Sequence, residues 1–189
     1  MAKYSPTEYA QLDMDALALR IDYGFLDYQV DVFHLAEAMG IKLFPYSDLN
    51  DKQRSHLSEK IAIDDGFTIS HSLPNGNYDF IIYFNDEIPI RRQRFTIAHE
   101  IKHIVYLELK PTEKDERLAD HFARALLVPS CLVVYLMENH NILELQEIFN
   151  VSLEAMSNAL SAANNRVLSK GNILNQYEID FLDSMESLK

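Results

Sequence analysis

The chain carries the segment RQRFTIAHEIKHIVYLEL at residues 92–109. Ile97 and Ile101 recur within it at helical spacing, so the segment has one apolar face. Pro111 follows, and proline cannot continue a helix. The pattern predicts a buried helix over residues 90–109.

Two histidines four residues apart, His99 and His103, lie in this predicted helix. Residues four apart share one helical face, so the two imidazoles can converge on one metal ion. Glu100 would then stand beside the metal as a general base, as in zinc hydrolases with an H-E-x-x-H pattern. The alternative is a pair of core imidazoles that bond to the backbone and carry no chemistry.

A tetrahedral catalytic zinc needs a third protein ligand, and residues 112–128 predict a helix that supplies one. Thr112 can cap this helix, and acids fill its first turn. Glu116 and Asp120 are four residues apart and share one face. We expect Glu116 to bind the metal and Asp120 to accept the outer N–H of a zinc-bound histidine.

Other interpretations of these residues stay open. The acids could simply form a solvated helix start. His121 is an alternative third ligand, although five residues from Glu116 it shares the metal-facing side less easily. A third histidine six residues after His103 is absent, since that position is Leu109. The residues therefore indicate a site of two histidines and one carboxylate.

The chain resembles the ImmA/IrrE-type metallo-endopeptidases in three motifs: RFTIAHE at residues 94–100, ERLADHFA at 116–123 and LLVP at 126–129. A fourth segment, FNVSLEAM at residues 149–156, is similar to the helix-turn-helix-like region that follows the peptidase core of this family. The chain looks most like the short, ImmA-like members.

The resemblance implies an α+β, zincin-like fold and a cytoplasmic, zinc-dependent endopeptidase. Such an enzyme cleaves a helix-turn-helix transcriptional repressor and so derepresses phage, mobile-element or stress-response genes. The implied zinc ligands are His99, His103 and Glu116, and the implied catalytic residue is Glu100. The sequence departs from the family at Lys102, where glycine is common, and Leu118, where a further acid is frequent.

We expect residues 1–130 to form the peptidase core and residues 131–189 a helical extension. The core should hold a small, mostly antiparallel sheet beside the H-E-x-x-H helix. Alternation and turn signals predict its elements: a helix over residues 13–39 closed by Gly40, strands at 41–44, 67–70 and 78–84, and a turn at 75–77.

The extension reads as helices at residues 132–137 and 142–149, a helix capped by Ser152 that runs to about residue 163, and an amphipathic helix within 172–188. Residues 152–165 contain Glu154 and no lysine or arginine. A helix that reads DNA presents basic side chains, so we expect this segment to pack or to dock substrate.

Composition narrows the class of protein. The 189 residues carry a formal net charge of −12, which gives no support for direct nucleic-acid binding and suits a basic protein partner. The first residues lack a signal peptide and no apolar run could span a membrane, so we expect a cytoplasmic protein. Cys131 is the single cysteine, which excludes an intrachain disulfide.

Two other functions compete with proteolysis. The chain could be an inactive zincin-like binding module, or an antitoxin, that sequesters a repressor or toxin without cleaving it. It could also control transcription directly through the Ser152 helix, although its charge makes that the weaker alternative.

Overall fold

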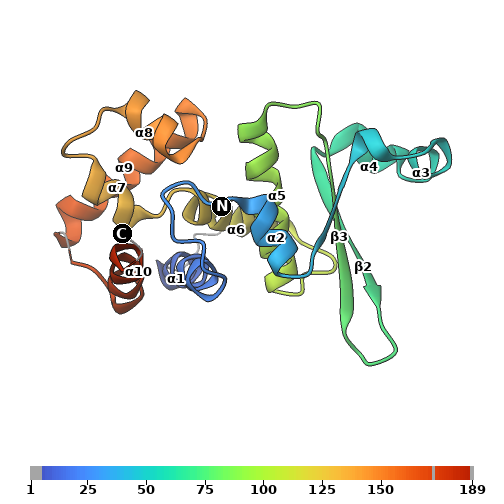
Figure 1. Cartoon of the computed structure of the whole chain (residues 1–189), viewed down its shortest axis with the longest axis horizontal. Helices are drawn as coiled ribbons and strands as arrows, with labels where there is room; N and C mark the ends of the chain where they lie inside the picture. The colour runs from blue at the N-terminus through green and yellow to red at the C-terminus, as the bar shows by residue number, and fades with distance from the viewer. Residues whose placement is uncertain (1–5, 172, 188–189) are drawn as a thin grey trace. The chain divides into compact units, whose positions relative to one another are not determined.

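The computed structural model describes residues 6–171 and 173–187 (Figure 1). It confirms the mixed α+β class, with a three-stranded sheet and many helices. Packing divides the chain into a middle unit, Asp31–Ala119, and a terminal unit, which comprises the chain up to Val30 and from Asp120 onward. This division by packing does not test the predicted domain boundary after residue 130, which stays a prediction.

The sheet lies in the middle unit and has the order β1-β3-β2. Strand β2 (Gly66–Ser72) pairs antiparallel with β3 (Tyr78–Phe84), and the turn between them has Gly76 at a φ of 84°. Strand β1 (Lys42–Pro45) pairs parallel with β3. The three predicted strands are confirmed, and the sheet, predicted to be mostly antiparallel, has one antiparallel and one parallel pairing.

Helices α2 (Val32–Ala38) and α5 (Ile90–Val105) cover one side of this sheet (Figure 1). Helix α5 comes very close to β2, because a Cβ atom on Gly66 would lie 2.4 Å from Cγ2 of Thr96. A side chain at residue 66 would therefore push helix and strand apart. The buried apolar residues of this part of the unit are Val32, Leu35, Ala36, Ile41, Ile82, Phe84, Ile97, Ala98 and Ile101.

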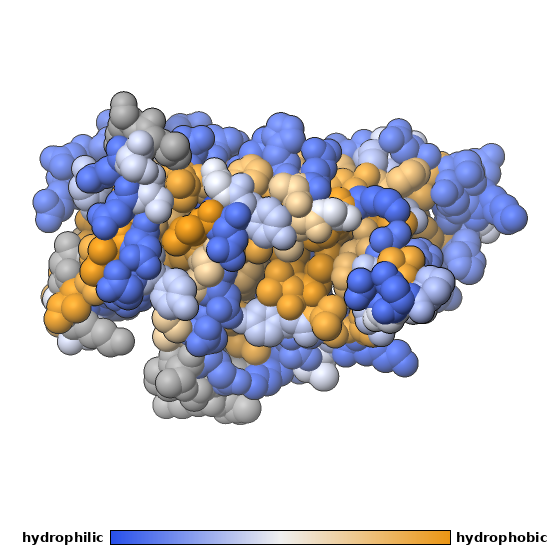
Figure 2. Space-filling view, turned by 60° about the horizontal axis from the view of Figure 1, so that its bottom comes forward, coloured by the Kyte–Doolittle hydropathy of each residue, from blue (hydrophilic) through white to orange (hydrophobic). Residues whose placement is uncertain are grey.

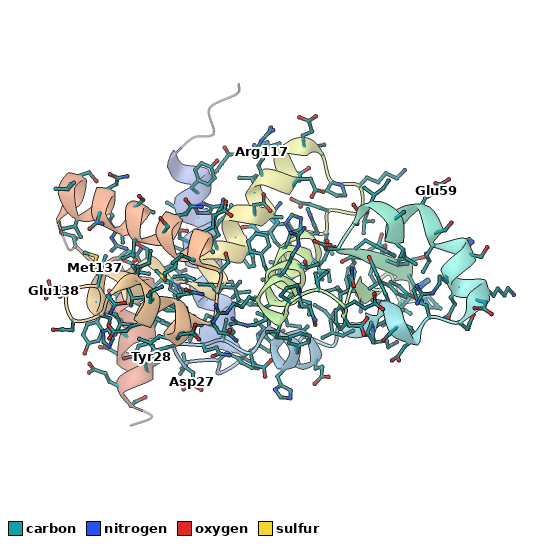
Figure 3. All side chains as sticks on the ribbon, turned by 90° about the horizontal axis from the view of Figure 1, so that it is seen from above. Asp27, Tyr28, Glu59, Arg117, Met137 and Glu138 are labelled. Carbon is teal, nitrogen blue, oxygen red and sulfur yellow. The ribbon has the colours of Figure 1, made fainter. Side chains whose placement is uncertain are left out.

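Three short helices lie on the other side of the sheet (Figure 1): η1 (Tyr46–Asp48), α3 (Asp51–His56) and α4 (Ser58–Ile63). They cover a second apolar cluster built on Tyr46, Leu49 and Phe67. Helix α4 also carries the exposed Glu59, which is labelled in Figure 3. No element of this segment was predicted from the sequence.

The prediction of one helix over residues 13–39 is wrong. Helix α1 (Pro6–Asp22) ends before Gly24, whose φ of 75° leaves the helical region. The buried guanidinium of Arg20 then holds the following turn, with Nε donating to the carbonyl oxygen of Phe25 at 3.0 Å. A separate N-cap, Asp31, starts α2.

The terminal unit is helical. Helices α7 (Ser130–Leu136) and α8 (Ile142–Phe149) both pack on α9 (Leu153–Lys170), and α10 (Gln176–Glu186) packs on α1. The expected cap is confirmed, since the backbone N–H of Ala155 donates to Oγ of Ser152 at 3.1 Å.

Two predictions for this unit need correction. Helix α9 is longer than expected, so it includes the basic residues Arg166 and Lys170. Arg166 is engaged within the unit, because its guanidinium donates to both carboxylate oxygens of Glu178. The amphipathic helix predicted within residues 172–188 begins only at Gln176, so Ile173, which is 75% exposed, lies outside it.

The surface is mixed in character. Hydrophilic residues (blue) and hydrophobic residues (orange) are both exposed on the face drawn in Figure 2. Among the described residues, no single helix is both long and apolar enough to cross a membrane; α6 (Glu113–Leu127) and α7 meet that test only as a pair bent by 43°.

Candidate metal centre

Helix α5 brings the predicted histidines and the predicted base together. His99, Glu100 and His103 each offer a donor atom, and these atoms all lie within 4.8 Å of one another. The segment is helical because its apolar residues face α2 and the sheet, and that packing leaves His103 and Glu100 almost wholly buried. The cluster could hold a metal ion.

Glu116 reaches the same cluster from the first turn of α6. Its Oε2 lies 3.0 Å from Nε2 of His99, and its Oε1 lies 3.6 Å from Nε2 of His103. The two Nε2 atoms are 3.1 Å apart. The Glu116 side chain is 49% exposed, so it is still solvated, but it also contacts both imidazoles.

These distances suit a tetrahedral ion. Ligand atoms at zinc bond lengths of about 2.0–2.1 Å are separated by about 3.3–3.4 Å along the edges of a tetrahedron. The separation between the two Nε2 atoms and that between Nε2 of His99 and Oε2 of Glu116 lie within a few tenths of an ångström of that value, and the 3.6 Å to Nε2 of His103 is measured from the other carboxylate oxygen, Oε1. Two imidazoles and one carboxylate are also a common donor set for catalytic zinc.

Glu100 is held by the sheet. The hydroxyl of Thr68, on β2, donates to Oε2 of Glu100 at 2.8 Å. Burial raises the pKa of Glu100, and the hydrogen bond from Thr68 and the nearby histidines oppose that shift. The carboxylate is therefore poised to accept a proton more readily than an exposed glutamate. Sequence reasoning missed Thr68, because a contact across 32 residues leaves no local signal.

Glu108 is a second residue that the sequence did not reveal. The chain turns back after α5 because Leu107 takes a left-handed conformation, with a φ of 53°, and the backbone N–H of Glu108 donates to the carbonyl of His103 at 2.8 Å. This turn places Oε2 of Glu108 2.7 Å from Nδ1 of His103. A carboxylate accepts here, so Nδ1 carries the hydrogen.

Lys102, the departure from the family pattern, is completely buried. Its ammonium donates to both carboxylate oxygens of Glu108 at 2.6 Å and to the backbone carbonyl of Asp115 at 3.3 Å. A lysine at a core position of a helix was the signal that an acid had to lie close by, since a buried charge needs a partner.

Two other predicted residues lie in the terminal unit. Nε2 of His121 lies 2.8 Å from Oδ1 of Asp13, and its ring packs against Tyr9, so the structure gives this histidine a partner other than a metal. Asp120 is the first residue of the second stretch of the terminal unit, and its role as the orienting carboxylate stays a prediction. For His103, the described acceptor is Glu108.

Comparison with known proteins identifies a family. Residues 36–161 match the peptidase M78 family model, described as an IrrE N-terminal-like domain. The match includes all the residues of α5 and α6 named above. No curated protein matches the chain.

One solved structure, a Mycobacterium tuberculosis transcriptional regulator, is similar with a TM-score of 0.51 and 18% sequence identity. The similarity covers 80% of this chain and 46% of that protein, so the chain spans less than half of its length. At this identity the likeness concerns the fold alone.

Proposed function

The chain belongs to the peptidase M78 family of IrrE N-terminal-like domains, and we propose that it is a zinc-dependent metallo-endopeptidase with a zincin-like core. The observation that carries the proposal is the convergence of His99, His103 and Glu116 at separations typical of zinc ligands. These three residues would hold the metal.

The residues around the site suit peptide hydrolysis. A bound zinc ion would supply a Lewis acid that activates water and polarises the peptide carbonyl. Glu100 would take the proton of the water and deliver it to the nitrogen of the leaving amine. The Thr68 hydroxyl would hold Oε2 of Glu100, so that the carboxylate stays oriented during this transfer.

The sheet offers a place for an extended substrate. Strand β2 is at an edge, since the order is β1-β3-β2, and its Thr68 contacts the proposed base. A peptide that pairs with the outer edge of β2 would add a strand to the sheet. We propose that the substrate binds in this way, as an extended segment.

We further propose that the substrate is a helix-turn-helix repressor and that cleavage derepresses phage, mobile-element or stress genes in the cytoplasm. The support is the family and the charge: a net charge of −12 would attract the basic surface of a DNA-binding protein. Arg166 on α9 is engaged by Glu178 and so is not presented to a phosphate backbone. The helix-turn-helix-like pair α8–α9 would then dock protein and not DNA.

The second candidate is a binding module that sequesters a repressor or toxin without cleaving it. The donor set argues for catalysis instead, because a module that only binds has no need of a buried glutamate beside two imidazoles.

Zinc titration of metal-stripped protein by calorimetry tests the site. We expect about one zinc per chain and a sharp loss of affinity in E116A, whereas the exposed control variant E59Q on α4 should bind as the native chain does. Absence of zinc binding by the native chain would contradict the proposal.

Co-expression with helix-turn-helix repressors from the same genome tests the activity. Fragments of one repressor that form with the native chain and vanish with E100Q would support proteolysis. A stable complex without fragments, unchanged by E100Q, would favour the binding module.

A further inference from the structure

The Lys102–Glu108 pair is more than a neutralised buried charge. Glu108 uses one carboxylate for two purposes, because both of its oxygens accept from Lys102 while Oε2 also accepts from Nδ1 of His103. In a neutral imidazole with its hydrogen on Nδ1, Nε2 keeps its lone pair. That Nε2 atom is the one that faces His99 and Glu116.

Lys102 also reaches the helix that carries the third donor. Its ammonium contacts the carbonyl of Asp115, the residue before Glu116, in the first turn of α6. The buried ammonium of Lys102 therefore joins α5 to the start of α6, next to the residue that carries the third donor. A hydrogen bond of this kind limits how far Glu116 can move from the two histidines.

We propose that Lys102 and Glu108 are positioning residues that preset the metal site before the ion arrives. Glu108 fixes the tautomer and the ring orientation of His103, and Lys102 holds Glu108 and the start of α6 in place. Carboxylates that accept the outer N–H of a ligating histidine commonly raise metal affinity by orienting the ring. This inference rests on the proposed function, since it assumes that His103 and Glu116 bind metal.

Calorimetric zinc titration of K102M and E108Q tests whether the two residues raise zinc affinity. Loss of such an outer partner typically lowers metal affinity about 10- to 100-fold, and we expect both variants to fall in that range. K102R keeps the cation and should recover much of the affinity. The matched control is K42M, which removes the lysine of the exposed Lys42–Asp79 pair and should leave zinc binding unchanged.

Nitrogen-15 NMR of the histidine rings in the native, metal-stripped chain tests the positioning itself. We expect His103 in the form with hydrogen on Nδ1, and a mixture of tautomers in E108A. A role in packing alone would not move this signal. The measurement on the native chain needs no substitution, so it is informative even if a variant fails to fold.

The outcomes distinguish failure of the proposed function from failure of the positioning role. If the native chain binds no zinc, the proposed function fails. If it binds zinc but K102M and E108Q bind equally well, or if His103 carries its hydrogen on Nε2, the proposed function stands and the positioning role is overturned.

Discussion

Each unit holds an ion pair that is largely shielded from solvent, but the two pairs have different neighbours. In the terminal unit, Arg166 on α9 binds Glu178 on α10, and the contacts join helix to helix. In the middle unit, Lys102 binds Glu108 beside a histidine of the candidate metal centre. An ion pair of this kind joins helices in one unit and contacts the candidate metal centre in the other, so a shielded charge does not by itself mark a functional site.

The largest effect should come from E100Q in the middle unit. Loss of a general base lowers the rate about 10²- to 10⁴-fold, and zinc affinity should stay close to native because Glu100 is not a proposed ligand. Cleavage of a repressor in a single-turnover assay, together with zinc titration, measures both quantities. Retained hydrolysis would remove Glu100 from the mechanism.

R166M should give the next largest effect, on stability instead of zinc binding. The cost should stay below the roughly 3–5 kcal/mol of a fully buried pair, because Arg166 is 19% exposed and Glu178 also accepts from the backbone N–H of Asn175. Urea unfolding measures the loss. Zinc affinity of the folded protein should be unchanged, and a drop like that of K102M would break the contrast between the two pairs.

The pH dependence of stability should depend on Glu100 in the middle unit. Because burial raises the pKa of Glu100, the folded chain holds this proton more tightly than the unfolded chain, in which glutamate titrates at about 4.3. The ionised group therefore reduces stability as pH rises from about 4 through the pKa of the folded state. Metal-stripped E100Q should gain stability over the native chain as pH rises, and a gain independent of pH would contradict the shift.

The smallest effect concerns two left-handed residues, one in each unit. Leu107 has a φ of 53° and Asn150 a φ of 48°, and asparagine tolerates this region better than leucine. L107G should therefore stabilise the chain by less than about 1 kcal/mol, the relief being partly offset by the entropy of glycine. N150G should gain less, and thermal unfolding that shows a larger gain for N150G would contradict this interpretation.

The sequence predicted the parts of the site that obey local rules. His99, Glu100 and His103 follow helical spacing, and Glu116 follows from the need for a third donor at a helix start. Thr68 and Glu108 could not be found in this way. The Thr68 contact depends on how β2 packs against α5. The Glu108 contact depends on the left-handed conformation of Leu107, which cannot be predicted from a leucine in the sequence.

The fold shows the same limit. Strands with clear alternation and helices with caps, such as Ser152, were predicted well. The break between α1 and α2 was not, because the apolar spacing continues across Gly24 while a buried arginine holds the turn by tertiary contacts. The short helices over residues 46–63 are packed on a cluster that only the folded sheet creates.

The close approach of β2 and α5 at Gly66 has a genetic consequence. A methyl group at residue 66 would overlap Thr96, on the helix that carries both histidines. Residue 66 is also only two residues from Thr68, which holds Glu100. A screen for loss of activity should therefore recover Gly66→Ala alongside changes in the ligands themselves. At residue 66 the site thus depends on a side chain that is missing.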